Sequence, residues 1–329
     1  METWQRVNLF LNGEDFLYWK KIIVNPYHDK YDLTIAIDKL LKNKRPYDAI
    51  DCIYKNVYDK KPLDVKRIVK ALKLALKSNE TLQTIKTYQI AKIIEAMQED
   101  SSVSSDDLFS IEWAYLPLLD GSHGVTPKYL EKKLAMDSDF FCEIIQIAYR
   151  SKKEPIEDLE KSKQKKSIAL NAWRLLHEWH IPPGVEVGGS FDEKHFNKWL
   201  QNVIEKCKKS GYLKIALSLI GQILFYSPAD STGLWINKAV AEALNRKDAE
   251  EIRNGFFSEA FNFRGVYWVD PSGKPERDLA KKYKAQANDV ENSGYFRFAN
   301  CIRKIADSFE KEADMVVEEH KMENDKHDV

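Results

Sequence analysis

Three histidines are close enough along the chain to suggest a metal site. His177 and His180 are three positions apart on one predicted helix, and His195 follows a segment that contains two glycines. Zinc-protease helices instead carry their histidine ligands four positions apart, and a third ligand must complete the geometry. The four cysteines, at positions 52, 142, 207 and 301, are too far apart to form a C-x-x-C ligand pair. We therefore expect no metal site, and we interpret the cysteines as buried free thiols.

The segment from Asp120 to Gly124 reads Asp-Gly-Ser-His-Gly and suggests a hydrolase nucleophile. A nucleophile elbow requires Gly-x-Ser-x-Gly between a strand and a helix, whereas here glycine directly precedes the serine and a predicted helix precedes the segment. The Gly-Gly-Ser at 188–190 lacks the Lys-Ser/Thr pair of a phosphate-binding loop. We therefore expect neither catalytic residues nor a cofactor. The alternative is a cryptic hydrolase or metal-dependent enzyme whose site assembles from distant positions.

Lysines are concentrated in the segment 152–166, which could contact phosphates of a nucleic acid. Glutamates and an aspartate within the same segment offset about half of this charge, and affinity for nucleic acid scales with the number of phosphates neutralised. Lys plus Arg and Asp plus Glu both number 51 in the whole chain, so the formal net charge is zero. Nucleic-acid binding through this segment is therefore an alternative function rather than the expected one.

A second segment, 262–275, interrupts the helical pattern and combines an arginine with aromatic residues. Arginine and aromatic side chains are enriched at protein interfaces. We predict that this segment contacts a protein or peptide partner. The alternative is that the aromatic rings fill space between helix hairpins while the arginine pairs with an acidic neighbour. The predicted contact residues are Asn262, Phe263, Arg264, Tyr267 and Trp268.

These residues must be positioned by helices, and the clearest pair lies between Phe196 and Pro228. The first helix has apolar residues at the i, i+3, i+4, i+7 spacing of one helical face, and Gly211 then allows a tight turn. The second helix ends before Pro228, which cannot continue it. The apolar faces are formed by Leu200, Val203, Ile204 and Cys207, and by Ala216, Ile220, Ile223 and Leu224.

This hairpin resembles the tetratricopeptide repeat, a 34-residue helix-turn-helix unit. Gly211, Ala216 and Pro228 occupy the positions of its turn residue, its small contact residue and its closing proline. A similar apolar pattern surrounds Ala49, but the two alanines are 167 residues apart, which is not a multiple of 34. The resemblance therefore implies an irregular array of helix pairs rather than a regular one.

A second resemblance covers residues from about 169 to 313. Its motifs are Trp173-x-Leu-Leu176, Trp179, Pro182-Pro-Gly184, Asn262-x-Arg-Gly265 and Glu276-Arg-x-Leu-Ala280. They resemble the C-terminal helical region of large, mostly uncharacterised bacterial proteins, some of which resemble anti-phage defence proteins. The resemblance implies a regulatory helical arm in a bacterial defence or signalling assembly.

Helical patterns cover most of the remaining chain, including one that holds Leu234 and Trp235 and a last one that ends near Val317. We expect two helical halves, 1–150 and 167–317, with a charged linker at 151–166 and a frayed tail at 318–329. No secretory signal and no apolar run of membrane length occur, so we expect a cytoplasmic protein without membrane contacts.

The expected fold is therefore all-α, an irregular α-solenoid of antiparallel helix hairpins of the tetratricopeptide or HEAT type. Stacked helix pairs form an extended concave surface that suits protein or peptide binding. The sequence predicts a non-catalytic interaction module that acts as a scaffold, with an oligomeric state that it does not specify.

Overall fold

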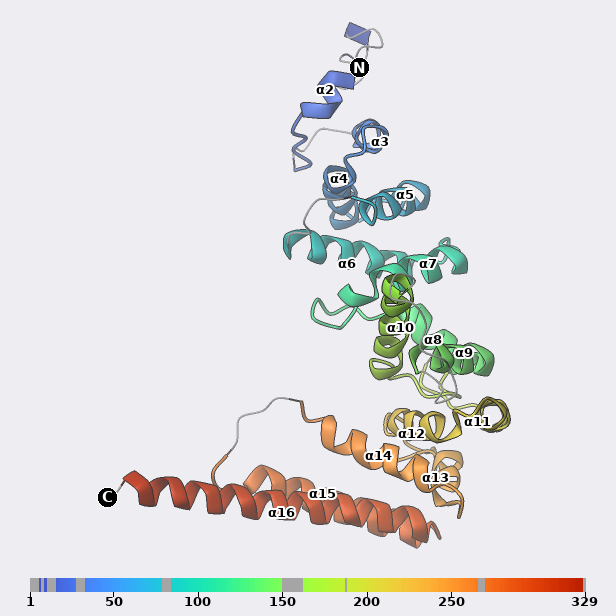
Figure 1. Ribbon diagram of the computed structural model, residues 1–329, viewed down its shortest axis with the longest axis vertical. Helices are drawn as coiled ribbons and strands as arrows, with labels where there is room; N and C mark the ends of the chain where they lie inside the picture. The colour runs from blue at the N-terminus through green and yellow to red at the C-terminus, as the bar shows by residue number, and fades with distance from the viewer. Residues whose placement is uncertain are drawn as a thin grey trace. The chain divides into compact units, whose positions relative to one another are not determined.

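The computed structural model describes residues 6, 9–10, 16–27, 33–78, 84–149, 162–186, 188–265 and 270–327 (Figure 1). Their regular secondary structure is entirely helical, and the nearest approach to a sheet is one isolated bridge between Val185 and Phe191. The all-α class is therefore confirmed for this part of the chain. The chain divides into two compact units, Met1–Leu130 and Glu131–Val329, which we call unit 1 and unit 2.

Unit 1 contains short helices that pack against their neighbours and next neighbours in the chain. Helix α4 contacts α3, α5 and α6, whereas α5 contacts α3 and α7 as well. Fully buried Leu40, Ile50, Leu72 and Ile90 share one core between these helices. The bounds are α2 (Phe16–Lys21), α3 (Thr34–Lys42), α4 (Pro46–Tyr58), α5 (Val65–Ala75), α6 (Thr84–Glu99), α7 (Ser105–Tyr115), a 3-10 turn (Leu116–Leu118), and the start of α8 (Lys128–Met136).

Local sequence signals explain where several of these helices begin. Pro46 occupies the first turn of α4, as predicted, because its missing N–H has no partner to lose there. The side chains of Asp64 and Ser104 accept backbone hydrogen bonds at the starts of α5 and α7. Such caps satisfy N–H groups that the first helical turn leaves without acceptors.

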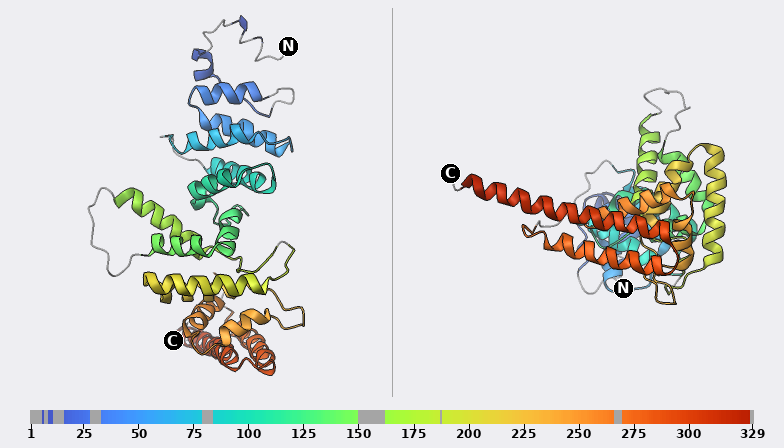
Figure 2. Two further views of the ribbon diagram at one scale, coloured as in Figure 1. Left: turned by 90° about the vertical axis from the view of Figure 1, so that its right-hand side faces the viewer. Right: turned by 90° about the horizontal axis from the view of Figure 1, so that it is seen from below.

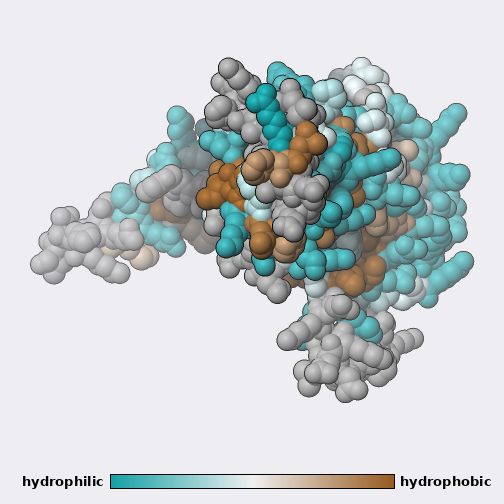
Figure 3. Space-filling view, turned by 90° about the horizontal axis from the view of Figure 1, so that it is seen from above, coloured by the Kyte–Doolittle hydropathy of each residue, from teal (hydrophilic) through white to brown (hydrophobic). Residues whose placement is uncertain are grey.

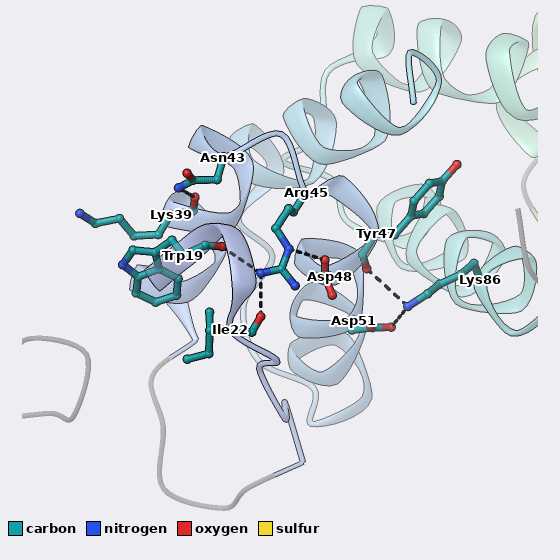
Figure 4. A network of polar contacts seen from close by, with 9 residues as sticks. All are labelled: Trp19, Ile22, Lys39, Asn43, Arg45, Tyr47, Asp48, Asp51 and Lys86. Carbon is teal, nitrogen blue, oxygen red and sulfur yellow. Dashed lines mark hydrogen bonds and ion pairs between the residues drawn. The ribbon is translucent and has the colours of Figure 1, made fainter. Parts of the chain in front are cut away.

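Arg45 and Lys86 connect helices of unit 1 through backbone oxygens (Figure 4). Arg45 Nη1 donates to the carbonyls of Trp19 at 2.9 Å and Ile22 at 2.6 Å, and its Nε donates to Asp48 at 2.9 Å. The carbonyls at the C-terminal end of a helix carry partial negative charge, so the guanidinium stabilises this end of α2. Lys86 of α6 pairs with Asp51 of α4. The guanidinium therefore ties α2 to the start of α4, and the ammonium ties α6 to α4.

Unit 2 contains longer helices, and its last two lie side by side along most of α15 (Figure 2). Helix α9 packs against α10 and α11, and α12 packs closely against α14. The bounds are α9 (Ser138–Ala148), α10 (Ser162–His177), α11 (Glu193–Ser210), α12 (Leu213–Leu224), α13 (Lys238–Asn245), α14 (Glu250–Asn262), α15 (Lys274–Asn292) and α16 (Phe296–His327).

The predicted hairpin between Phe196 and Pro228 is confirmed as α11 and α12. Gly211 follows α11 with φ +84°, a left-handed conformation that glycine adopts without steric cost. Ala216 and Cys207 on the predicted inner faces are 0% and 1% exposed. The turn chemistry and the apolar spacing therefore gave the correct local structure.

Some predicted boundaries differ from the structure. Leu234 and Trp235 precede α13, because Asn237 accepts a hydrogen bond from the Ala239 N–H and begins the helix there. Helix α16 continues to His327 rather than ending near Val317, and the added residues include no glycine or proline to stop it.

The two compact units divide at Leu130 and Glu131, before the charged segment 151–166. Helix α10 begins within that segment, at Ser162, and packs against α9 in unit 2. The rest of the charged segment, 151–161, lies outside the described residues. Among the described helices, none has the length and apolar character needed to cross a membrane.

Candidate protein-interaction surface

A row of aromatic rings crosses the surface of unit 1 between α4, α6 and the loop that follows α7. The ring of Tyr54 lies 6.4 Å from that of Tyr58 and 6.2 Å from that of Tyr88. The Tyr88 ring in turn meets His123 edge-to-face at 5.8 Å. Aromatic pairs at such separations attract each other through their quadrupoles. The sequence places Tyr54 and Tyr58 one helical turn apart, so packing of α6 on α4 completes the row.

The tyrosines line an open groove with a volume of about 860 Å³. Tyr58 is 68% exposed and Tyr88 is 38% exposed, so both rings are accessible to a partner. We call this surface the tyrosine groove; besides short apolar side chains it is lined by Tyr54, Tyr58, Tyr88, Lys60, Lys61, Lys92, Glu95, Glu99, Asp100 and Ser101. The mixture of both charge signs with aromatic rings suits a peptide better than a uniformly anionic ligand.

Lysine ammonium groups lie over the two exposed rings. Lys55 Nζ lies 5.7 Å from the Tyr58 ring centre, and Lys92 Nζ lies 5.9 Å from the Tyr88 ring centre. Lys92 also donates to Glu95 at 2.9 Å, and this hydrogen bond raises the pKa of Lys92. Burial, assisted by the neighbouring Tyr88, raises the pKa of Tyr54. Rings fixed before binding lose less conformational entropy when a partner docks.

The tyrosine groove differs from the surface that the sequence predicted. The predicted residues in 262–275 belong to unit 2, where Arg264 Nη2 donates to the fully buried Glu276 at 2.6 Å. Its guanidinium carbon also lies 5.5 Å from the Phe309 ring centre, and Nη1 lies 3.4 Å from Glu312. This arrangement matches the alternative in which the arginine pairs with an acidic neighbour inside the unit.

The other predicted partner residues are in different environments. Asn262 is the last residue of α14, and Phe263, 62% exposed, packs its ring 5.3 Å from that of Phe225. Tyr267 and Trp268 lie outside the described residues. Among the described residues of this set, Phe263 therefore carries the exposed aromatic ring that a partner could contact.

The three histidines considered as metal ligands have separate structural contacts. His177 Nδ1 donates to the Trp173 carbonyl at 2.8 Å, and His180 packs edge-on against Tyr226. His195 Nε2 donates to the Ala135 carbonyl at 3.0 Å, where it caps the end of α8. In the part of the chain that the structure describes, no group of three His, Cys, Asp or Glu residues is placed to hold a metal ion.

The segment from Asp120 to Gly124 forms a turn rather than a nucleophile elbow. Asp120 accepts a hydrogen bond from the Ser122 N–H at 2.9 Å. The Ser122 hydroxyl, together with this N–H, lowers the pKa of Asp120. His123 Nε2 lies 3.3 Å from the Thr87 hydroxyl at the end of the tyrosine row. The segment Asp120–Gly124 therefore contributes His123 to the aromatic row, where this ring contacts Tyr88 and Thr87 of α6.

A second surface of unit 1 is basic. Three exposed lysines lie on one face of α5, and a fourth follows the helix at the same i, i+4, i+7, i+11 spacing. They line a groove of about 520 Å³ together with Val65, Val69, Leu74 and Asp107. We call this surface the lysine face; its lysines are Lys66, Lys70, Lys73 and Lys77. The lysine-rich segment named in the sequence prediction lies mostly outside the described residues.

Apolar side chains are also exposed at the N-terminal end of unit 1. Phe10, Phe16 and Leu17 are 89%, 58% and 67% exposed. In the view of that end, apolar side chains occur among polar ones (Figure 3).

Sequence reasoning missed the tyrosine groove because its residues come from two helices, α4 and α6, and from the residues that directly follow each of them. The available signals were the i, i+4 pairs Tyr54–Tyr58 and Tyr88–Lys92, each on the less apolar side of its helix. Only the packing of α6 against α4 makes these pairs adjacent. The chain as a whole matches no protein-family model, no curated protein and no solved structure.

Proposed function

We propose that the protein is a non-catalytic interaction module in which the tyrosine groove of unit 1 binds a linear segment of a partner protein. The observation that carries this proposal is the row of rings from Tyr58 to His123, in which the exposed rings of Tyr58 and Tyr88 lie beneath the ammonium groups of Lys55 and Lys92. Tyrosine supplies a large contact area and a polar hydroxyl while losing only two side-chain rotations on binding.

The proposed architecture is an irregular α-solenoid of antiparallel helix hairpins. The contacts of α5 with α3 and α7, and of α4 with α6, support two alternating layers in unit 1. Such layers present rows of side chains from successive hairpins to one partner. A regulatory role in a bacterial defence or signalling assembly is the part of the proposal that rests on the resemblance of residues 169–313 alone.

A library of linear peptides displayed on phage, selected on the intact protein, would test the proposal. The affinity of an enriched peptide is then measured by fluorescence anisotropy for the wild type and for the double variant Y58A/Y88A. We expect the double variant to lose about tenfold or more in affinity, since interface tyrosines contribute roughly 1–2 kcal/mol each.

The matched control is F296A, which removes a 61% exposed aromatic ring from unit 2. This control should bind the enriched peptide with unchanged affinity. Circular dichroism should show the same helicity for all three proteins, since the truncated rings are accessible. Equal affinity of Y58A/Y88A and the wild type would refute the tyrosine groove as the binding surface.

Nucleic-acid binding is the second candidate function, and the lysine face is the described observation that favours it. Four exposed lysines in this row could contact successive phosphates, and each neutralised phosphate makes binding more salt-dependent. If this candidate is correct, oligonucleotide affinity should fall by a steep power of salt concentration, and K70E/K73E should reduce the slope by about two. Absence of salt-dependent binding would exclude the lysine face as a phosphate site.

A further inference from the structure

Two of the four cysteines lie in direct contact inside unit 2. Cys142 of α9 and Cys207 of α11 are 65 positions apart in sequence, and their Sγ atoms are 3.5 Å apart. Both side chains are largely shielded from water, with 4% and 1% exposure. The other two, Cys52 and Cys301, belong to different helices, and each is a buried free thiol. The packing of α9 on α11 therefore creates one thiol pair among residues that the sequence keeps apart.

Neighbouring contacts hold the two helices in this register. Lys206, next to Cys207, forms an ion pair with Asp139, one helical turn before Cys142. Asn202 Nδ2 lies 3.5 Å from the Ser138 hydroxyl, again between α11 and α9. The side chains of Lys206 and Asp139 are 46% and 60% exposed, so a solvent-accessible ion pair joins the same two helices one residue from Cys207.

The two thiols are chemically unequal. The hydrogen bond between them lowers the pKa of Cys142, and the ammonium of Lys206 adds to this effect. The same hydrogen bond, followed by burial, raises the pKa of Cys207. The thiolate is the reactive form of cysteine, and the Lys206 ammonium, which pairs with Asp139 on the helix of Cys142, favours the thiolate of Cys142.

We infer that Cys142 and Cys207 form a reversible disulfide when the protein meets a peroxide. The Cys142 thiolate attacks one oxygen of hydrogen peroxide, the O–O bond breaks, and the departing hydroxide takes a proton to become water. Sγ of Cys207 then attacks the Cys142 sulfenic acid, its proton leaves with the hydroxyl group as a second water, and the S–S bond forms. The two thiols lose two electrons, and the peroxide gains them.

The geometry requires little rearrangement. A disulfide has an S–S distance of about 2.05 Å, so the sulfurs must approach by roughly 1.5 Å, which side-chain rotation and small helix shifts can supply. Sequence spacing gives no sign of this pair, since the residues do not form a C-x-x-C motif. The resulting bond would link α9 to α11 and close a long loop of the chain.

Hydrogen peroxide treatment of the folded protein tests this inference. The reaction is quenched in acid, free thiols are alkylated under denaturing conditions, and the digest is analysed by mass spectrometry. We expect one cross-linked peptide pair, Cys142–Cys207, that dithiothreitol reverses, while Cys52 and Cys301 remain alkylated. The variant C52S/C301S should give the same cross-link. Absence of this cross-link, or equal cross-linking of all four cysteines, would overturn the inference.

The order of reaction is tested with single variants and dimedone, which traps sulfenic acids. C207S should accumulate a dimedone adduct at Cys142, whereas C142S should show little adduct at Cys207. Oxidised wild type should also melt about 5 °C or more above the reduced protein, since closing a long loop restricts the unfolded chain. An adduct mainly at Cys207 in C142S would reverse the assigned roles and contradict this mechanism.

Discussion

Gly221 of α12 and Gly255 of α14 face each other where the two helix backbones touch. A Cβ atom on Gly221 would lie 1.9 Å from the Ile252 carbonyl oxygen, and one on Gly255 would lie 1.9 Å from the Ser218 carbonyl oxygen. Both distances are far shorter than any contact a side-chain carbon can make. The reciprocal pair explains why two glycines occur inside helices, where each costs about 1 kcal/mol relative to alanine.

Replacing either glycine by alanine should destabilise unit 2 although alanine is the better helix former. The added methyl group must push α12 and α14 apart, which should cost about 1–3 kcal/mol or more in the free energy of unfolding. Thermal unfolding of G221A and G255A, followed by circular dichroism, should show melting temperatures lower by about 5 °C or more. S258A, on the exposed side of α14, is the control and should melt at or above the wild-type temperature. A stabilised G255A would contradict the close approach of the two backbones.

Removing Arg264 should destabilise unit 2 rather than only weaken a surface contact. Glu276 is fully buried, and the R264A variant would leave its carboxylate without this cation. Loss of one partner of a buried ion pair costs about 3–5 kcal/mol in the free energy of unfolding. Urea unfolding of R264A should show this loss, while R264M/E276Q should recover part of it. An R264A protein of wild-type stability would contradict a stabilising role of the Arg264–Glu276 ion pair.

The carboxyl groups of Glu112 and Asp38 should give unit 1 opposite dependences on pH. Burial raises the pKa of Glu112 although Gln98 donates to it at 2.7 Å and the Leu130 N–H at 2.9 Å. The hydrogen bond from Arg67 instead lowers the pKa of Asp38. The folded protein therefore binds a proton at Glu112 more tightly than the unfolded chain does. The resulting contribution to stability is fully present below about pH 4.5 and is lost as pH rises through the pKa of the folded state.

The contribution of Asp38 is present above about pH 3.8 and is lost as pH falls through its lowered pKa. It should be the smaller of the two, since the Asp38 side chain is 52% exposed. Unfolding free energies of the wild type, E112Q and D38N, measured between about pH 3 and about pH 7, test both signs. The unfolding free energy of the wild type minus that of E112Q should decrease as pH rises. The unfolding free energy of the wild type minus that of D38N should increase as pH rises. Parallel curves for all three proteins would contradict both assignments.

Replacing Arg45 should release α2 without unfolding the rest of unit 1. The R45M side chain cannot donate to the Trp19 and Ile22 carbonyls, so the end of α2 loses its cationic partner. Limited trypsin digestion at Lys20 and Lys21, measured by mass spectrometry, should become several-fold faster, because local opening exposes the backbone to the protease. K42M, which removes an exposed cation from the end of α3, should leave this cleavage rate unchanged. Equal cleavage of R45M and wild type would show that other contacts of Trp19 suffice to hold α2.

The sequence by itself determined the helical class and most helix positions, since these depend on apolar spacing, turn glycines and prolines that act within a few residues. It correctly predicted the α11–α12 hairpin, the turn at Gly211 and the start of α4 at Pro46. It placed helix boundaries less well at α13 and α16, where side-chain capping and continued helix propensity act beyond the apolar pattern.

Only the tertiary structure decided which surfaces these helices create. The tyrosine row, the Cys142–Cys207 contact and the Gly221–Gly255 approach each join residues more than 30 positions apart, and no local spacing encodes such pairings. Arg264 shows the same limit, because the aromatic residues around it in sequence predicted a partner contact, and only the structure shows that it pairs with buried Glu276. Local patterns specify helices through short-range backbone and side-chain preferences, whereas contacts between helices depend on how their faces pack.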